Sequence, residues 1–296
     1  MKPDLYIQKS YVFLRENWAH LAIWGVFFAL YFPVLAILYT ARWKMIDYEH
    51  AYFILPISVY LAWRVRGELS KVHKENVGTV VFTLSCVLLG FSVAMYVFGW
   101  KWDYMLISAV SFIPASVSLT GLFYGWQVVK KLWFSFFYLI FMIPPPAAVL
   151  DGITRPMRVV SSKIAFLMLK AAGYNPTVEG FIIKIGDFSA LVGAECSGFR
   201  SFITLTALGL LYIYMYAREE RLSYKAVLLG LIPVLAIIGN SLRICLISLL
   251  GYYFGEKVAS GPLHYGSGYL VYVFMIIGLF LADRLMGKLL PAKKQF

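Results

Sequence analysis

The chain has 296 residues, of which 61% are hydrophobic and 14% are charged, and its formal net charge is +12. Soluble domains carry about 25% charged residues, so this composition excludes an ordinary soluble enzyme and predicts a membrane domain that fills the chain. The lysines and arginines gather at the ends of apolar segments and not on one face of a domain, which argues against nucleic-acid binding.

Eight apolar segments are candidates for membrane helices, because a hydrocarbon core of about 30 Å needs about 20 apolar residues. They cover residues 17–40, 49–65, 77–99, 103–127, 131–150, 198–217, 225–251 and 265–286. We therefore expect an all-α polytopic membrane protein with about eight transmembrane helices. We expect one domain over residues 1–296, with its core at 17–286 and no C-terminal soluble domain.

Basic residues at the ends of these segments indicate the orientation of the chain. They precede the first segment and follow the second, fourth, sixth and eighth: Lys2, Lys9 and Arg15; Arg64, Arg66, Lys71 and Lys74; Lys130 and Lys131; Arg218, Arg221 and Lys225; Arg284, Lys288, Lys293 and Lys294. All of them fall on one side of the membrane if both termini are cytoplasmic. The sequence therefore predicts a multi-pass protein of the cell membrane with cytoplasmic termini.

Residues 152–172 are apolar enough to resemble a ninth span, but they carry four basic residues. If this segment crossed the membrane, Arg218 and Arg221 would lie outside. We therefore expect an interfacial amphipathic helix on the outer side, after the break at Pro144 to Pro146. Two β-rich runs follow within residues 177–192 and flank Gly186-Asp187, which predicts a small hairpin in an outer loop.

Cys196 follows this hairpin directly and precedes the sixth apolar segment. A helix N-terminus favours a thiolate, and Ser197 is placed to cap the helix. Glu195 and Arg200 stand nearby, where lipid-facing leucines are the usual choice in a membrane helix. Most membrane cysteines are buried small residues, but these polar neighbours favour a reactive one.

Two further polar residues are predicted close to the outer surface. Arg243 lies inside the seventh segment, where burial of a cation costs roughly 2.5–3.5 kcal/mol, and Asn240 shares its helix face. The alternative for Arg243 is snorkelling to the interface. His264 opens the eighth segment and could act as an acid or base near a thiol, although a boundary histidine is more often structural.

The remaining cysteines and outer polar residues carry weaker signals. Cys86 and Cys245 lack polar partners and are interpreted as packing residues. Asp47 and His50 lie in the first outer loop, where they are either solvated or shape an entrance to the site. The sequence has neither an HExxH motif nor a close ligand pair, and Arg243 would repel a cation, so we expect no metal and no cofactor.

Three ordered motifs carry a resemblance to a known family. Glu195-Cys196-Ser197-Gly198-Phe199-Arg200-Ser201, then Asn240-Ser241-Leu242-Arg243-Ile244, then His264 resemble the exosortase/archaeosortase family. The N-terminal half agrees through Asp47-Tyr48-Glu49-His50, Leu55-Pro56, Tyr60-Leu61-Ala62-Trp63-Arg64 and Phe141-Met142-Ile143-Pro144. The resemblance covers nearly the whole chain from residue 17 to residue 286.

The resemblance implies a membrane cysteine transpeptidase with nucleophile Cys196, cation Arg243 and acid/base His264. Its substrates would be secreted proteins with a C-terminal sorting signal: a short Pro-containing motif, a transmembrane helix and a basic tail. The cleaved product would pass to an acceptor such as a lipid or glycan amine. Two alternatives stay open at this point: a lipid or anion transporter that uses Arg243, and a protease that cuts within the bilayer.

Overall fold

The structure is a computed structural model that describes residues 3–44, 48–69, 78–192, 199–216, 222–259 and 261–289, without the side chains of 3–17, 147, 262–265 and 289. It divides into two compact units, Met1–Pro144 and Pro145–Phe296, and each unit is described by itself. The expectation of a single domain stays a prediction.

Helices dominate both units, as expected from the apolar segments. Six of the described helical segments are long and apolar enough to cross a membrane: Trp18–Arg42, Thr79–Lys101, Met105–Tyr124, Phe199–Tyr216, Leu222–Phe254 and Gly266–Lys288. This confirms an all-α polytopic membrane protein. The second predicted span contains a shorter apolar helix, Ala51–Arg64.

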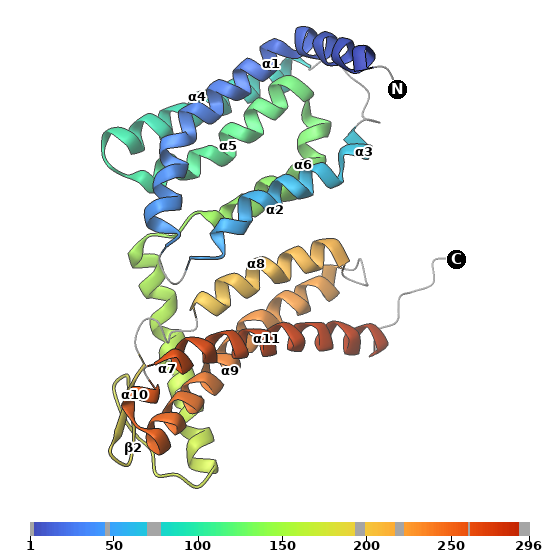
Figure 1. Cartoon of the computed structure of the whole chain (residues 1–296). Helices are drawn as coiled ribbons and strands as arrows, with labels where there is room; N and C mark the ends of the chain where they lie inside the picture. Colours follow the sequence, from blue (N-terminus) through green and yellow to red (C-terminus); the bar gives the residue numbers. More distant parts are fainter. Residues whose placement is uncertain are drawn as a thin grey trace. The chain divides into compact units, whose positions relative to one another are not determined.

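The first unit contains six α-helices and two short turns of other helical types within its described residues. They are α1 (Pro3–Ile37), the π-helical turn η1 (Leu38–Arg42), α2 (Ala51–Arg64), α3 (Arg66–Leu69), α4 (Thr79–Lys101), α5 (Met105–Tyr124), α6 (Trp126–Tyr138) and the 3-10 turn η2 (Leu139–Met142). Figure 1 shows α4 and α5 side by side. Their contact is close because Gly99 faces Ser108, whose hydroxyl donates to the Tyr96 carbonyl at 3.0 Å.

The fifth predicted span, 131–150, is not one continuous helix. Its first half belongs to α6 and η2, and the helix α7 begins only at Ala147. The prolines at 144–146 explain the break, because proline lacks a backbone N–H and disfavours a helical conformation in the residue before it. The indole of Trp43 donates to the carbonyl of Met142 at 2.8 Å and holds the end of η2 within the first unit.

The second unit is a bundle with a small sheet at one end. Its elements are α7 (Ala147–Ala171), β1 (Thr177–Glu179), β2 (Ile182–Ile185), β3 (Phe188–Leu191), α8 (Phe199–Tyr216), α9 (Leu222–Phe254), α10 (Glu256–Ala259) and α11 (Pro262–Leu289). Helices α8, α9 and α11 lie side by side (Figure 1). Small residues allow this close packing, since a Cβ at Gly239 of α9 would lie 2.8 Å from the Met275 sulfur of α11.

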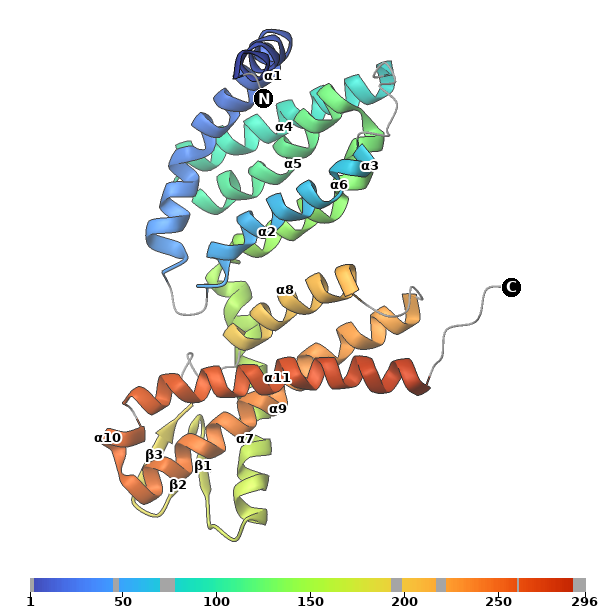
Figure 2. The ribbon, with the colours of Figure 1, turned by 45° about the vertical axis from the view of Figure 1, so that its right-hand side comes forward.

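Helix α7 contacts α9 but runs across the direction of α8 and α11 (Figure 2). Its buried face is made of small and apolar side chains: Thr154, Met157, Ser161, Ser162, Ala165 and Leu169. The basic residues Arg155, Lys163 and Lys170 are exposed. The predicted amphipathic helix is therefore present, and its place on the membrane surface stays a prediction.

The predicted hairpin is confirmed and is part of a larger sheet. Strands β2 and β3 pair with Ile185 opposite Phe188, which leaves Gly186-Asp187 as a two-residue turn. Gly186 has φ +56, the left-handed conformation that such turns need. The sequence did not predict β1, which pairs with the other edge of β2.

The sheet is fixed to α9 by a glycine on the helix. The Phe188 ring of β3 lies directly on Gly251, where a Cβ would overlap it. Tyr252 is also close, because a Cβ at Gly186 would lie 3.0 Å from its ring. We call this end of the second unit, with the sheet, the end of α9 and the start of α11, the hairpin end (Figure 2).

We predict that Gly251→Ala weakens this attachment. The added methyl group must displace the Phe188 ring, and overpacking of this kind costs about 1–3 kcal/mol. Thermal unfolding in detergent should show a lower midpoint. Gly230→Ala is the matched control on the same helix: its Cβ meets nothing, and alanine favours a helix over glycine by about 1 kcal/mol. Equal midpoints for the two variants would contradict the proposed contact.

Candidate functional site

Several predicted site residues fall outside the described part of the chain. Glu195, Cys196 and Ser197 belong to the undescribed segment 193–198, and Asp47 belongs to 45–47. The flanks of the first segment are described: Val192 and Phe199 are both 2% exposed. The segment that carries Cys196 therefore connects two buried residues of the second unit.

Arg243 is half-buried on α9 and lies against α11. A Cβ at Gly268 would be 3.8 Å from the guanidinium carbon of Arg243 and 3.9 Å from its Nε. The absence of a side chain at Gly268 thus leaves the space that the guanidinium needs. Arg243 therefore faces the helix bundle, which argues against simple snorkelling along a lipid-facing surface.

The register between α8 and α11 tells where along the bundle this contact lies. Three pairs define it: Arg200 with Tyr269, Gly209 with Leu279, and Tyr212 with Asp283. Positions about 70 residues apart therefore face each other, and the two helices run in the same direction. Gly268, and with it the Arg243 guanidinium, lies level with the start of α8 at Phe199.

Two buried polar residues lie within one turn of Arg243 and Gly268. Asn240 is 2% exposed and precedes Arg243 by three positions, so they share a helix face as expected. Ser267 is 3% exposed on α11. His264 lies in the first turn of α11, one helical turn before Gly268. The structure therefore brings Arg243, Asn240 and the backbone of His264 to the hairpin end.

Arg200 adds a second cation at this end. It is the second residue of α8, and its guanidinium carbon lies 5.7 Å from the ring centroid of Tyr269 on α11. This distance is within the range of a cation–π contact. His50 belongs to the first unit, where it precedes α2 and its ring centroid lies 5.3 Å from that of Tyr48.

Arg158 was predicted only as one of the four basic residues of the amphipathic helix. Arg158 of α7 is half-buried with its guanidinium carbon 4.7 Å from the Phe181 ring centroid. The carbonyl of Phe181 accepts the backbone N–H of Val192 at 2.7 Å. Arg158 is thus linked through Phe181 to the residue that precedes the Cys196 segment. The spacing of charges along an amphipathic helix does not reveal such a contact.

The other two cysteines lie in different surroundings. The Cys245 thiol is buried and donates to the Ala165 carbonyl of α7 at 3.5 Å, which agrees with a packing role. Cys86 is exposed on α4, which does not agree with its interpretation as a packing residue. The residue before it, Ser85, is buried and packs against Gly121 of α5.

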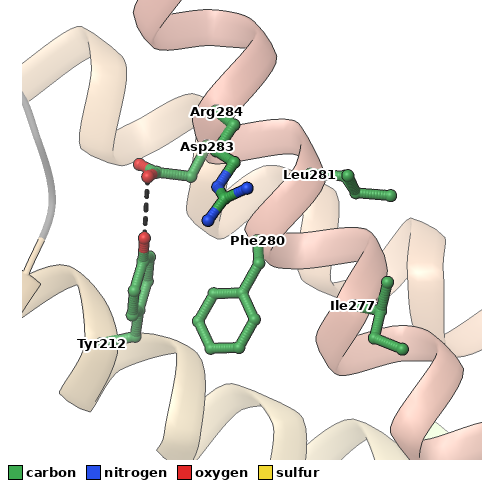
Figure 3. Close-up of a pocket in the computed structure, with 6 residues that line it drawn as sticks. All are labelled: Tyr212, Ile277, Phe280, Leu281, Asp283 and Arg284. Carbon is green, nitrogen blue, oxygen red and sulfur yellow. Dashed lines mark hydrogen bonds between the residues drawn. The ribbon is translucent and has the colours of Figure 1, made fainter.

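The opposite end of the second unit contains a buried carboxylate. Asp283 of α11 has 0% exposure; Tyr212 donates to its Oδ2 at 2.7 Å, and the Tyr224 hydroxyl lies 2.8 Å from its Oδ1. We call this the Asp283 end. A pocket of about 440 Å³ opens beside it, and Figure 3 shows Arg284 and Phe280 next to Tyr212 there. The sequence could have indicated this site, because Asp283 is an acidic residue within an apolar segment.

Comparison with known families decides among the open alternatives. The family described as transmembrane exosortase (Exosortase_EpsH) matches residues 43–281. This chain belongs to the transmembrane exosortase family. The match covers both units and most of the elements described above. No curated protein and no solved structure matched the chain.

Family membership confirms the resemblance seen in the motifs. Exosortases are membrane cysteine transpeptidases, so the chain has a transpeptidase-type role in general terms. The six long apolar helices agree with a multi-pass member of this family. The contact of Arg243 with Gly268 is described by the structure, and the assignment of Arg243 to the catalytic site stays a prediction.

We predict a graded response at Gly268. Gly268→Ala places its Cβ at an ordinary contact distance of 3.8 Å from Arg243, whereas Gly268→Leu needs the space of the guanidinium. Cleavage of a co-expressed reporter with a C-terminal sorting signal should fall slightly in the first variant and be lost in the second. Gly230→Leu, at a site with open space, is the control. Full cleavage by a folded Gly268→Leu protein would contradict the role of this contact.

Proposed function

We propose that this exosortase cleaves secreted proteins at a C-terminal sorting signal through a thioester on Cys196 and passes the product to an acceptor. One observation supports it most: Arg243 faces Gly268 at the level where α8 begins. Cys196 precedes Phe199 by three residues, and three residues of chain span at most about 11 Å. In this proposal the Cys196 thiol lies near that level, which is within reach of the chain that precedes Phe199.

Each of the three residues has one chemical task in this proposal. The Cys196 thiolate attacks the scissile carbonyl carbon, and a C–S bond forms while the carbonyl oxygen becomes an oxyanion. Arg243 stabilises the negative charge. The tetrahedral intermediate collapses, the C–N bond breaks, and the protonated His264 gives its proton to the leaving amine. An acceptor amine or water then attacks the thioester, returns a proton to His264 and releases the thiolate.

Six further residues have supporting tasks in this proposal. Asn240 lies on the same face as Arg243, and we assign it the task of orienting that side chain. Arg200, at the start of α8, adds positive charge near the thiolate. We propose that Glu195 and Ser197 shape the immediate surroundings of Cys196. Asp47 and His50 are proposed to line the entrance for the substrate.

The proposed orientation has both termini in the cytoplasm and the hairpin end outside, in the cell membrane, with the whole chain as one functional domain. Helix α9 has 33 residues and is about 50 Å long, which exceeds a hydrocarbon core of about 30 Å. Its excess length carries the sheet at the hairpin end. Helix α8 has 18 residues, about 27 Å, so its start lies near the membrane boundary. In this arrangement α7 lies on the outer surface.

The proposed substrates follow from this topology. A sorting signal with a short Pro-containing motif, a transmembrane helix and a basic tail would place its motif at the outer boundary when its helix packs beside the spans. The basic tail would remain in the cytoplasm by the positive-inside rule. The acceptor would be a lipid or glycan amine that reaches the same boundary. No metal or cofactor is needed in these steps.

Replacement of the nucleophile tests this function directly. Cys196→Ala should abolish cleavage of a co-expressed sorting-signal reporter, measured by mass spectrometry of the reporter's C-terminus, because no thioester can form. The mass of the product also identifies any attached acceptor. Cys245→Ala is the matched control, since its thiol is buried in packing against α7. Wild-type cleavage by Cys196→Ala would rule the mechanism out.

Thiol labelling tests the orientation. In a Cys86→Ser, Cys245→Ser background, a membrane-impermeant maleimide applied to intact cells or spheroplasts should label Cys196. Lys163→Cys on exposed α7 should also be labelled from outside, whereas Lys225→Cys at the start of α9 should react only after the membrane is opened. Protection of Lys163→Cys from the outside together with reaction from the inside would show that α7 has been placed on the wrong side.

A further inference from the structure

Tyr272 of α11 has a hydroxyl with no role in the packing of the bundle. Its oxygen is buried and has no hydrogen-bond partner among the residues that the structure describes. Its ring packs against the core cluster of the second unit together with Phe202 of α8. A buried tyrosine hydroxyl normally finds a partner, because leaving it unpaired costs about 1–3 kcal/mol. The unpaired donor therefore needs an explanation.

The position of Tyr272 on its helix points to the site. It follows Gly268 by four residues and His264 by eight, so the three positions form one stripe along α11. Side chains on an α-helix lean toward its N-terminus and cover the preceding turn. By this rule we expect the phenol of Tyr272 to extend from its own level toward Gly268, where the Arg243 guanidinium lies.

The register with α8 leads to the same location. Positions about 70 residues apart face each other on α8 and α11, so Tyr272 lies level with Phe202, less than one turn inside Phe199. A phenol that leans toward the start of α11 also leans toward the start of α8. Tyr272 thus lies just inside the level of Phe199, and a Phe at position 272 would fill the same apolar space.

We propose that the Tyr272 hydroxyl is a catalytic hydrogen-bond donor for the carbonyl oxygen of the peptide substrate. It would donate to that oxygen beside Arg243 and hold it more strongly as the oxygen becomes an oxyanion. This assignment rests on the proposed function, because it needs a carbonyl attacked by Cys196. No bond to hydrogen breaks in this step: the phenol keeps its proton, and the oxyanion loses the hydrogen bond when the carbonyl reforms.

A neutral phenol suits this position beside an arginine. A phenol adds a donor without adding to the positive charge that Arg243 and Arg200 already bring to this end. Both donors are carried by helices whose contact is fixed at Gly268, so neither needs to reorganise when charge develops. The pair would have the two donors that oxyanion sites generally present.

Tyr272→Phe tests the proposal with the full-length enzyme in nanodiscs and the sorting-signal reporter. Removing one oxyanion donor should lower kcat by roughly 100-fold and leave KM within about twofold. The thermal midpoint should stay equal or rise, because the variant loses an unpaired buried hydroxyl. Tyr216→Phe, exposed at the other end of α8, is the matched control and should keep wild-type kcat.

Three results would overturn the assignment. A kcat within about twofold of wild type would show that the hydroxyl does not contact the reacting oxygen. A loss of activity with a lower thermal midpoint would indicate a structural role. Slower alkylation of Cys196 by iodoacetamide in Tyr272→Phe would mean that the phenol supports the thiolate instead. Failure of the proposed function is recognised separately, since the reporter would then be cleaved equally well by Cys196→Ala.

Discussion

The contact between Arg243 and α11 is the constraint on which the hairpin end depends. A membrane interior offers no water to a guanidinium, so the protein must surround it, and Gly268 provides the space. That requirement fixes the register of α9 against α11. The same register, continued through Gly239 and Met275, sets the packing of the bundle. The register therefore places Arg243 close to the start of α8 and to the first turns of α11.

The sheet extends this constraint beyond the helices. Phe188 on Gly251 fixes β3 to the end of α9, and Val192 follows β3 at once. The chain therefore reaches the Cys196 segment from an anchored strand and leaves it into an anchored helix. Phe181, in the turn between β1 and β2, contacts this strand end through its carbonyl, and Arg158 of α7 packs on its ring. The proposed mechanism needs the Cys196 thiol close to Arg243 on another helix, and these contacts hold the residues on both sides of the Cys196 segment.

Composition and charge spacing predicted the membrane fold, the hairpin around Gly186 and the polar face of Arg243 and Asn240, because these depend on local periodicity. The break between α6 and α7 was predicted from the prolines at 144–146, but the fifth predicted span was extended past it to residue 150 because the chain stays apolar there. Strand β1 and the Tyr272 hydroxyl could not be predicted. Both depend on partners that only tertiary packing brings close, and a tyrosine in an apolar helix resembles any other aromatic residue.

The carboxylate of Asp283 has a consequence for motion within the bundle. Parting α8 from α11 at that end would break the hydrogen bond from Tyr212 to Asp283, while Tyr224 of α9 would keep its contact with the carboxylate. Loss of a hydrogen bond to a buried charged group costs about 1.5–3 kcal/mol. The Arg200–Tyr269 contact at the other end is weaker and partly exposed. The two helices are therefore held together more strongly at the Asp283 end than at the Arg200–Tyr269 end. Separation of the two helices should therefore begin at the Arg200–Tyr269 end.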